Sequence, residues 1–240
     1  MLRALIQLTD KNKATLDPEE LHHLVRVRRA RLDDLFLGLD GRGKLYRCCL
    51  QKNDQGWFAK VLEEVESTRE SSLKITLGQA LIKKDKFEWV IQKATELGIS
   101  TIVPLITGRT EVRPSGPGED RKIRRWRRVL LEAVKQSKRS YIPELSNPID
   151  LKAYLETTSA SAKLFLDEKN GIQLKEMIEE NRQRSSWMVL IGPEGGWSKS
   201  DREIFKQNQV YPVHLGSRIL RTETAPVAIL SILQYELGDL

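Results

Sequence analysis

LGSRILRTETA, at residues 215–225, is a polar loop sequence between two short apolar segments of the chain. We expect the segment before it, residues 210–215, to form a strand, and the segment after it, residues 225–233 (APVAILSIL), to form a final buried helix. The loop combines several backbone amides with two opposite charges, Arg221 and Glu223. A loop in this position is a candidate ligand site.

The residues at both ends of this loop favour that order of elements. Gly216 permits a tight turn directly after the strand, because glycine tolerates backbone conformations that other residues avoid. Thr224 is expected to cap the final helix, and Pro226 suits the first turn of that helix. The local sequence therefore predicts a strand, a turn and a helix in close succession.

A second glycine-bearing loop lies upstream. The apolar run at residues 187–191 leads into GPEGG, residues 192–196, after which Ser198 or Ser200 can start a helix. Two such loops at the ends of apolar strands predict one crevice at the edge of an α/β sheet, where ligands bind. Ordinary strand-to-helix turns share this pattern, so the spacing alone leaves both interpretations open.

Length and composition favour one or two domains with a substantial core. The chain has 240 residues, of which 40% are hydrophobic. No stretch is apolar over the length of a membrane span, and the N-terminal sequence MLRALIQLTD lacks the apolar core of a signal peptide. We therefore expect a cytoplasmic protein without a membrane partner.

Cysteine and histidine usage argues against a disulfide-stabilised or metal-centred fold. The two cysteines, Cys48 and Cys49, are adjacent, and the three histidines are scattered at positions 22, 23 and 214. This pattern predicts no metal site and is typical of a reducing compartment. The formal net charge of +7 and the pI of about 9.4 favour a polyanionic partner.

Residues 1–70 are predicted to form a small, mostly β domain. Asp17 can cap a short helix, and Glu20 can complete a capping box with it. Apolar stretches separated by polar turns predict a series of strands. The expected strands cover residues 2–8, 35–39, 45–51 and 57–65.

An arginine cluster follows the predicted helix of this domain. Arg26, Arg28 and Arg29 lie near the C-terminal end of the helix, where the helix dipole tolerates cations. The cluster can bind phosphate groups, or it can be an ordinary solvated helix end, and the pattern leaves both interpretations open.

The polar stretch ESTRESS, at residues 66–72, separates this domain from a second one at residues 73–240. Beyond it strands alternate with helices, which predicts a largely parallel sheet. One helix is expected to start at Asp85, with Glu88 three residues on, and to end before Gly98. The other expected elements are strands at residues 73–82, 101–107, 163–166 and 187–191, a loop at 108–118, and helices at 120–137 and 172–181.

The predicted helix at residues 120–137 is the most basic element of the chain. Ile123, Trp126 and Leu130 form an apolar stripe, so the arginines occupy the outward faces. Such a density of like charge destabilises a helix unless anions neutralise it, which favours a nucleic-acid surface over a merely solvated one. The predicted RNA-binding residues of the chain are Arg26, Arg28, Arg29, Arg124, Arg125, Arg128 and Arg139.

Five segments carry a resemblance to a known family: HHLVRVRR (residues 22–29), EWVIQKATELG (88–98), EAVKQSKRSYIPEL (132–145), IGPEGGWS (191–198) and LGSRILRTETA (215–225). In these segments the chain resembles the RsmE family, the 16S ribosomal RNA uracil-N3 methyltransferases of the SPOUT class. One departure is Leu32-Asp33-Asp34, which stands where the family has a Gly-Asp turn.

The resemblance implies a mixed fold with two parts. Residues 1–70 would form a PUA-like β-barrel that docks RNA, and residues 73–240 would form a SPOUT α/β domain with a deep trefoil knot that binds S-adenosylmethionine. The general rules of chain connection treat knots as rare exceptions, so only the resemblance predicts this one. It also implies a homodimer that acts on 16S ribosomal RNA or on the small ribosomal subunit.

A methyl donor of this kind needs apolar walls and backbone groups that approach it closely. Residues of suitable type occur at the ends of the predicted strands and in the two glycine-bearing loops. The candidate cofactor-binding residues are Leu166, Leu190, Gly192, Pro193, Gly195, Gly196, Leu215, Gly216, Ile219, Leu220, Arg221, Thr224 and Ala225.

Arg221 and Glu223 are the candidate catalytic residues. Uracil N3 carries a weakly acidic proton that Glu223 could accept, and Arg221 could hold a phosphate or stabilise the uracil anion. Alternatively, the two side chains pair with each other only to hold the loop. Because N3 lies on the pairing edge, the target base must be unpaired or flipped out.

Three other functions make different demands on the sequence. Ribose 2′-O-methylation of RNA would need the same cofactor loops but a different target atom. A non-catalytic RNA-binding assembly factor would not need the intact glycines at residues 192–196. A nicotinamide dehydrogenase is excluded, because no G-x-G-x-x-G motif follows the first strand of the α/β half.

Overall fold

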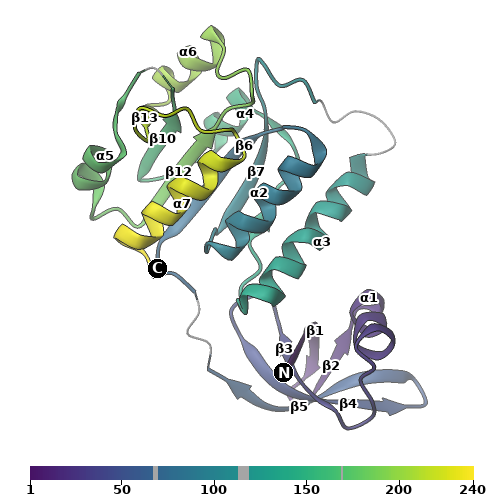
Figure 1. The fold of residues 1–240 in the computed structure, drawn as a ribbon. Helices are drawn as coiled ribbons and strands as arrows, with labels where there is room; N and C mark the ends of the chain where they lie inside the picture. The colour runs from purple at the N-terminus through teal and green to yellow at the C-terminus, as the bar shows by residue number, and fades with distance from the viewer. Residues whose placement is uncertain (67–69, 113–118, 169) are drawn as a thin grey trace. The chain divides into compact units, whose positions relative to one another are not determined.

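The computed structural model describes residues 1–66, 70–112, 119–168 and 170–240, and these divide into two compact units (Figure 1). The first unit contains Met1–Glu70 and Val134–Ile142, and the second contains Ser71–Ala133 and Pro143–Leu240. The placement of Val134–Ile142 in the first unit was not predicted from the sequence. Part of the loop predicted at residues 108–118 lies outside the described residues.

The first unit is a closed barrel, as predicted. Its strands follow the order β1-β2-β5-β4-β3, and β1 pairs in parallel with β3 to close the ring. Alternate strand side chains, among them Ile6, Phe36 and Leu50, point inward and form one apolar core. Leu24, from the helical segment after β2, packs into the same core. The strands are β1 (Leu2–Asp10), β2 (Lys13–Leu16), β3 (Leu35–Leu39), β4 (Leu45–Asn53) and β5 (Gly56–Val65).

The helix α1 (Pro18–His22) starts as predicted and continues into a π-helical turn, His23–Val27. The side chain of Asp17 accepts a hydrogen bond from the N–H of Glu19 at 2.9 Å and so caps the helix. The predicted capping box is wrong. The carboxylate of Glu20 is buried, and it accepts instead from the N–H of Leu5 at 3.1 Å and pairs with Lys135 at 2.9 Å. A buried carboxylate needs such partners, and these partners take the place of the backbone N–H group that a capping box would use.

Glu70 fastens Val134–Ile142 to the barrel unit. Its carboxylate pairs with the buried guanidinium of Arg139 at 2.8 Å. The same carboxylate accepts hydrogen bonds from the backbone N–H groups of Ser140 at 2.8 Å and Tyr141 at 2.9 Å. Charge-assisted bonds of this kind are stronger than neutral ones, so this segment is firmly part of the first unit.

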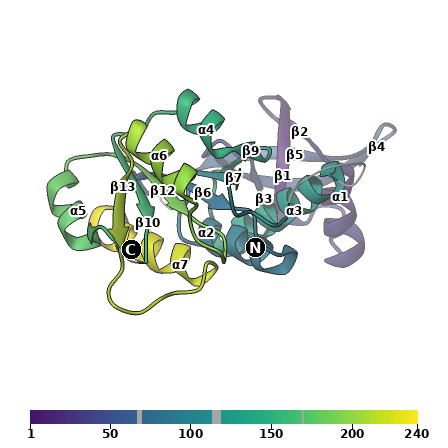
Figure 2. The ribbon, with the colours of Figure 1, turned by 90° about the horizontal axis from the view of Figure 1, so that it is seen from above.

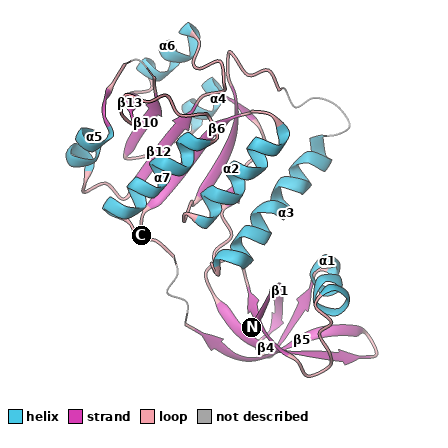
Figure 3. Ribbon diagram, in the orientation of Figure 1, coloured by secondary structure: helices cyan, strands magenta, loops and turns pink. Residues whose placement is uncertain are grey.

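The second unit contains a sheet in which every described strand pair is parallel (Figure 3). The strand order is β11-β13-β10-β12-β6-β7-β8, and β9 pairs with β7. The predicted parallel α/β fold is therefore confirmed. The strands are β6 (Lys74–Ala80), β7 (Thr101–Ile106), β8 (Glu144–Leu145), β9 (Ile149–Asp150), β10 (Ala162–Leu166), β11 (Ile172–Gln173), β12 (Ser186–Ile191) and β13 (Tyr211–His214).

Helices cover both faces of this sheet. Figure 2 shows α4 (Leu151–Thr157) and α6 (Lys199–Gln207) on one face, with α2 (Lys84–Glu96) and α7 (Thr224–Leu237) on the other. Under α6 the rings of Phe165 and Phe205 stack with centroids 4.2 Å apart. The remaining helices are α3 (Glu119–Ser137) and α5 (Leu174–Asn181).

Two of the predicted helix starts are wrong. For a third helix, the structure decides between the two serines predicted to start it. Lys83, not Asp85, is the N-cap of α2, because its carbonyl already accepts the N–H of Phe87 at 3.2 Å. Thr224 is the first residue of α7 rather than its cap, since its N–H donates to the carbonyl of Arg221 at 2.9 Å. Of the two serines proposed for α6, Ser198 is the cap.

The described part of the chain contains no helix long and apolar enough to cross a membrane. Within the same residues, no group of three or more histidine, cysteine, aspartate or glutamate side chains is placed to hold a metal ion. The trefoil knot implied by the resemblance stays a prediction.

Candidate active site

Three neighbouring parallel strands end at one cavity. β13, β10 and β12 are adjacent in the sheet, so their carboxyl ends meet at the same edge. The loops after β12 and β13, at residues 192–198 and 215–223, line one cavity of about 730 Å³. This volume is typical of pockets that bind small molecules.

Most of the residues predicted from sequence lie in this cavity. The two loops and the end of β10 supply them, and the two candidate catalytic residues are among them. The predicted residues that line the cavity are Leu166, Gly192, Pro193, Gly195, Gly196, Leu215, Gly216, Ile219, Leu220, Arg221, Glu223 and Ala225.

Two predicted cofactor-binding residues do not line the cavity. Leu190 is fully buried in the core between the sheet and its helices. Successive side chains of a strand point to opposite faces, so the next residue, Ile191, lines the cavity instead. Thr224 is exposed on the first turn of α7, outside the cavity lining.

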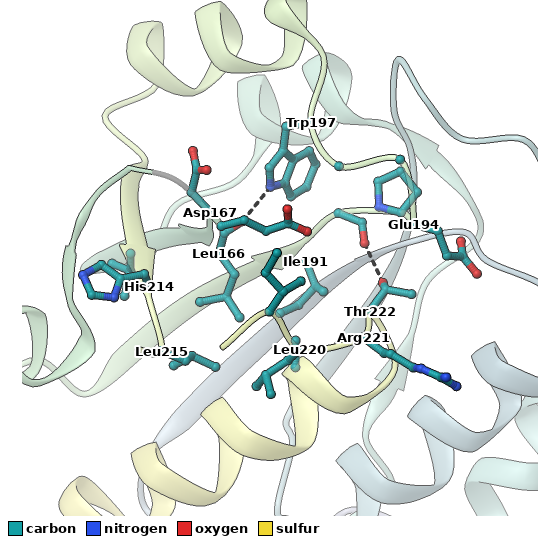
Figure 4. A pocket seen from close by; sticks show the side chains of 18 of the residues that line it. Leu166, Asp167, Ile191, Glu194, Trp197, His214, Leu215, Leu220, Arg221 and Thr222 are labelled. Carbon is teal, nitrogen blue, oxygen red and sulfur yellow. Dashed lines mark hydrogen bonds between the residues drawn. The ribbon is translucent and has the colours of Figure 1, made fainter. Parts of the chain in front are cut away.

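Apolar side chains gather in the middle of the cavity. Leu166, Leu215 and Leu220 converge there from the end of β10 and from the loop after β13 (Figure 4). Trp197 is buried beside them, and its indole N–H donates to the carbonyl of Leu166 at 2.8 Å. This bond holds the loop after β12 against the end of β10.

Glycine at position 196 is required by the backbone conformation. Its φ of +66° lies in the left-handed region, and its N–H donates to the carbonyl of Pro193 at 2.9 Å in a tight turn. A Cβ built at Gly196 meets no described atom within 4 Å. The missing side chain therefore leaves open space at this lining residue, where a ligand could approach the backbone.

Glu223 is paired with Lys86 rather than with Arg221. Among the described residues no ion pair joins Arg221 and Glu223, so the structure does not support the alternative in which they only hold the loop. Lys86, in the first turn of α2, lies 3.3 Å from Glu223 and 3.2 Å from Glu194. Hydrogen bonding raises the pKa of Lys86 above its ordinary value, with the bond to Glu194 contributing most and the bond to Glu223 next.

Several residues that line the cavity were not predicted from the sequence. Asp167 had a usable signal, because it directly follows a predicted parallel strand; its buried carboxylate pairs with Arg202. Arg109 lies in the loop after β7, where its guanidinium donates to the carbonyl of Gly195 at 2.6 Å. Lys86 carried no signal, because it comes from a helix far away in sequence. The other missed residues include Ile191, Trp197, His214 and Thr222.

The predicted RNA-binding arginines fall into two exposed groups and one exception. Arg26, Arg28 and Arg29 are exposed after α1, and Arg124, Arg125 and Arg128 are exposed on α3. Arg125 also pairs with Glu88 of α2 at 2.7 Å. The prediction needs correction at Arg139, whose guanidinium is buried against Glu70 and is not offered to a phosphate.

Two family models match this architecture. A model of the RNA methyltransferase domain matches residues 69–234, well over half of the chain. A model of the RNA methyltransferase PUA domain matches residues 16–62, within the barrel unit. The two domains of the chain are thus those of an RNA methyltransferase with a PUA domain.

Individual relatives narrow the class further. The chain is 34% identical over 220 residues to ribosomal RNA small subunit methyltransferase E of Synechocystis sp., covering 90% of this chain and 71% of the relative. It resembles the crystal structure of ribosomal RNA small subunit methyltransferase E from Neisseria gonorrhoeae, bound to S-adenosyl methionine, with a TM-score of 0.88, 28% identity and coverage of 100% and 99%. A Legionella pneumophila protein in complex with the cofactor SAM gives a TM-score of 0.91 at 30% identity, again covering 100% and 99%.

The chain belongs to the ribosomal RNA small subunit methyltransferase E family. The resemblance to the RsmE family drawn from five sequence segments is therefore confirmed.

Proposed function

We propose that this protein transfers a methyl group from S-adenosylmethionine to N3 of a specific uridine in 16S ribosomal RNA, as a homodimer in the cytoplasm. The observation that carries the proposal is one cavity formed by two glycine-bearing loops, with a carboxylate and a guanidinium among the residues that line it. Two structurally similar proteins that bind S-adenosylmethionine support the choice of methyl donor.

The residues of the cavity suit this donor. Leu166, Leu215 and Leu220 would pack against its apolar parts, and the backbone around Gly196 would hydrogen-bond its polar ones. When bound, S-adenosylmethionine supplies a methyl group whose bond to sulfur breaks with its electron pair staying on sulfur while the bond to N3 forms. Holding the two reactants in line is a large part of the catalytic effect.

Glu223 and Arg221 would act on the base. Glu223 accepts the N3 proton as the new N–C bond forms, which leaves the methylated uracil neutral. Arg221 is exposed at the rim and stabilises the negative charge that develops on the uracil oxygens. The exposed arginines of the barrel unit and of α3 would hold the surrounding phosphates, because phosphate contacts position RNA.

Ribose 2′-O-methylation is the second candidate, since the same cavity could serve it. An experiment that separates the two is mass mapping of methylated nucleotides in ribosomal RNA from a strain that lacks the gene, with and without complementation. We expect one N3-methyluridine of 16S RNA to disappear and to return with the wild-type gene. Loss of a ribose methyl group instead, or of no modification at all, would refute the proposed function.

A further inference from the structure

Lys86 joins the two loops of the cavity through a pair of carboxylates. Its ammonium lies 3.2 Å from Oε1 of Glu194, in the loop after β12, and 3.3 Å from Oε1 of Glu223, at the start of α7. The lysine itself comes from the first turn of α2, so three separate segments meet at this one cation. All three residues line the cavity.

The two carboxylate oxygens of Glu223 have different surroundings. Oε1 contacts Lys86, whereas Oε2 is buried and has no hydrogen-bond partner among the described residues. The Glu223 side chain as a whole is only 16% exposed. A buried acceptor without a partner is unfavourable, and native structures rarely keep one without a reason.

We propose that Lys86 is a positioning residue, which holds Oε1 of Glu223 so that Oε2 is left to accept the N–H of an imide base. This inference rests on the proposed function and adds a residue to it. A lysine suits the task because its ammonium can donate to both carboxylates at once. The raised pKa of Lys86 keeps that ammonium charged well above neutral pH. The contact to Glu194 ties the orientation of Glu223 to the loop that would hold the methyl donor.

The test compares single-turnover methyl transfer by Lys86→Met, Lys86→Gln and Lys86→Arg at saturating RNA and S-adenosylmethionine. We expect the first two variants to lose rate by on the order of 10- to 100-fold, as for a misplaced reacting group. Lys86→Arg should recover most of the rate, and calorimetry should show donor affinity within about threefold of wild type. Lys93→Met is the matched control, because Lys93 is an ion-paired lysine of the same helix outside the cavity.

A double-mutant cycle distinguishes positioning from mere stabilisation. If Lys86 acts through Glu223, adding Lys86→Met to Glu223→Gln should lower the rate no further. Additive losses, or a loss of donor affinity as large as the loss of rate, would overturn the inference. The inference would also be overturned if the wild-type protein methylates uridine N3 and Lys86→Met does so at the same rate. That result would leave the proposed function intact. A wild-type chain that methylates no uridine N3 would overturn both.

Discussion

The hydroxyl of Thr222 donates a hydrogen bond to the backbone carbonyl of Gly192 at 2.6 Å, joining the two loops that form the cavity. The amide of Gln79, at the end of β6, donates to the same hydroxyl at 3.2 Å. Both side chains are buried, so neither bond can be replaced by water without rearrangement. The shape of the cavity therefore depends on a residue whose side chain takes no part in the proposed chemistry.

Thr222→Val should weaken both the fold and donor binding. Valine has nearly the shape of threonine but leaves the Gly192 carbonyl without its donor, which costs about 1–3 kcal/mol of unfolding free energy. Thr222→Ser keeps the hydroxyl and should lose much less. Urea denaturation measures the stability, and calorimetry with S-adenosylmethionine measures the affinity. Unchanged affinity in Thr222→Val would mean that the loops keep their places without this bond.

Gly196→Val should abolish donor binding while the second unit stays folded. The valine side chain would occupy the open side of the loop, and the left-handed backbone at this position costs about 1–2 kcal/mol for a residue with a Cβ. Gly56→Val is the matched control, because Gly56 also has a positive φ and open space but lies in the barrel. Comparable losses of affinity in both variants would place the effect in folding rather than in the cavity.

RNA affinity should fall steeply as salt concentration rises. Each phosphate of single-stranded RNA that an arginine neutralises contributes about −0.7 to the slope of log K against log salt. Reversing Arg124 and Arg128 to glutamate should therefore weaken binding and flatten the slope, with donor affinity unchanged. Lys152→Glu with Lys175→Glu changes net charge equally, on the exposed faces of α4 and α5. If both double variants weaken RNA binding equally, the effect comes from net charge and not from contacts of these arginines with phosphates.

The cavity could be predicted from the sequence because the elements that form it are local in the chain. An apolar strand, a glycine turn and a helix follow one another in the chain, and parallel strands bring such loops to one edge. Partners that are distant in sequence could not be predicted in this way. The sequence places Arg139 in a basic segment, but in the fold its guanidinium pairs with Glu70, which is distant in the chain. Lys86 is likewise brought to Glu223 only by the fold.

Smaller errors have equally local causes. Leu190 and Ile191 are both apolar, and only the register of β12 decides which one faces the cavity. Thr224 is a residue type that often caps helices, but α7 begins one residue earlier than predicted, so that Glu223 occupies the N-cap position. Composition alone contains neither piece of information.

The stability of the barrel unit should decrease at alkaline pH because of Cys48. Burial raises the pKa of its thiol from 9.0 to about 11, so the folded chain holds the proton that the unfolded chain releases. Unfolding is therefore favoured progressively as pH rises above 9.0 toward about 11. Urea denaturation across this range measures the decline, and Cys48→Ala should have a shallower one. Parallel curves for the two proteins would assign the decline to other groups.

Glu223→Gln should lower single-turnover methyl transfer by about 10²- to 10⁴-fold, the range expected for loss of a general base. Glutamine keeps the shape of the side chain but cannot take up the N3 proton, and donor affinity should change little. Raising the pH should partly rescue the variant, because the uracil then loses its own proton more readily. Glu236→Gln is the control, since Glu236 is a paired carboxylate on α7 outside the cavity. A near-normal rate in Glu223→Gln would make alignment of the two reactants, rather than proton removal, the main contribution of this chain to catalysis.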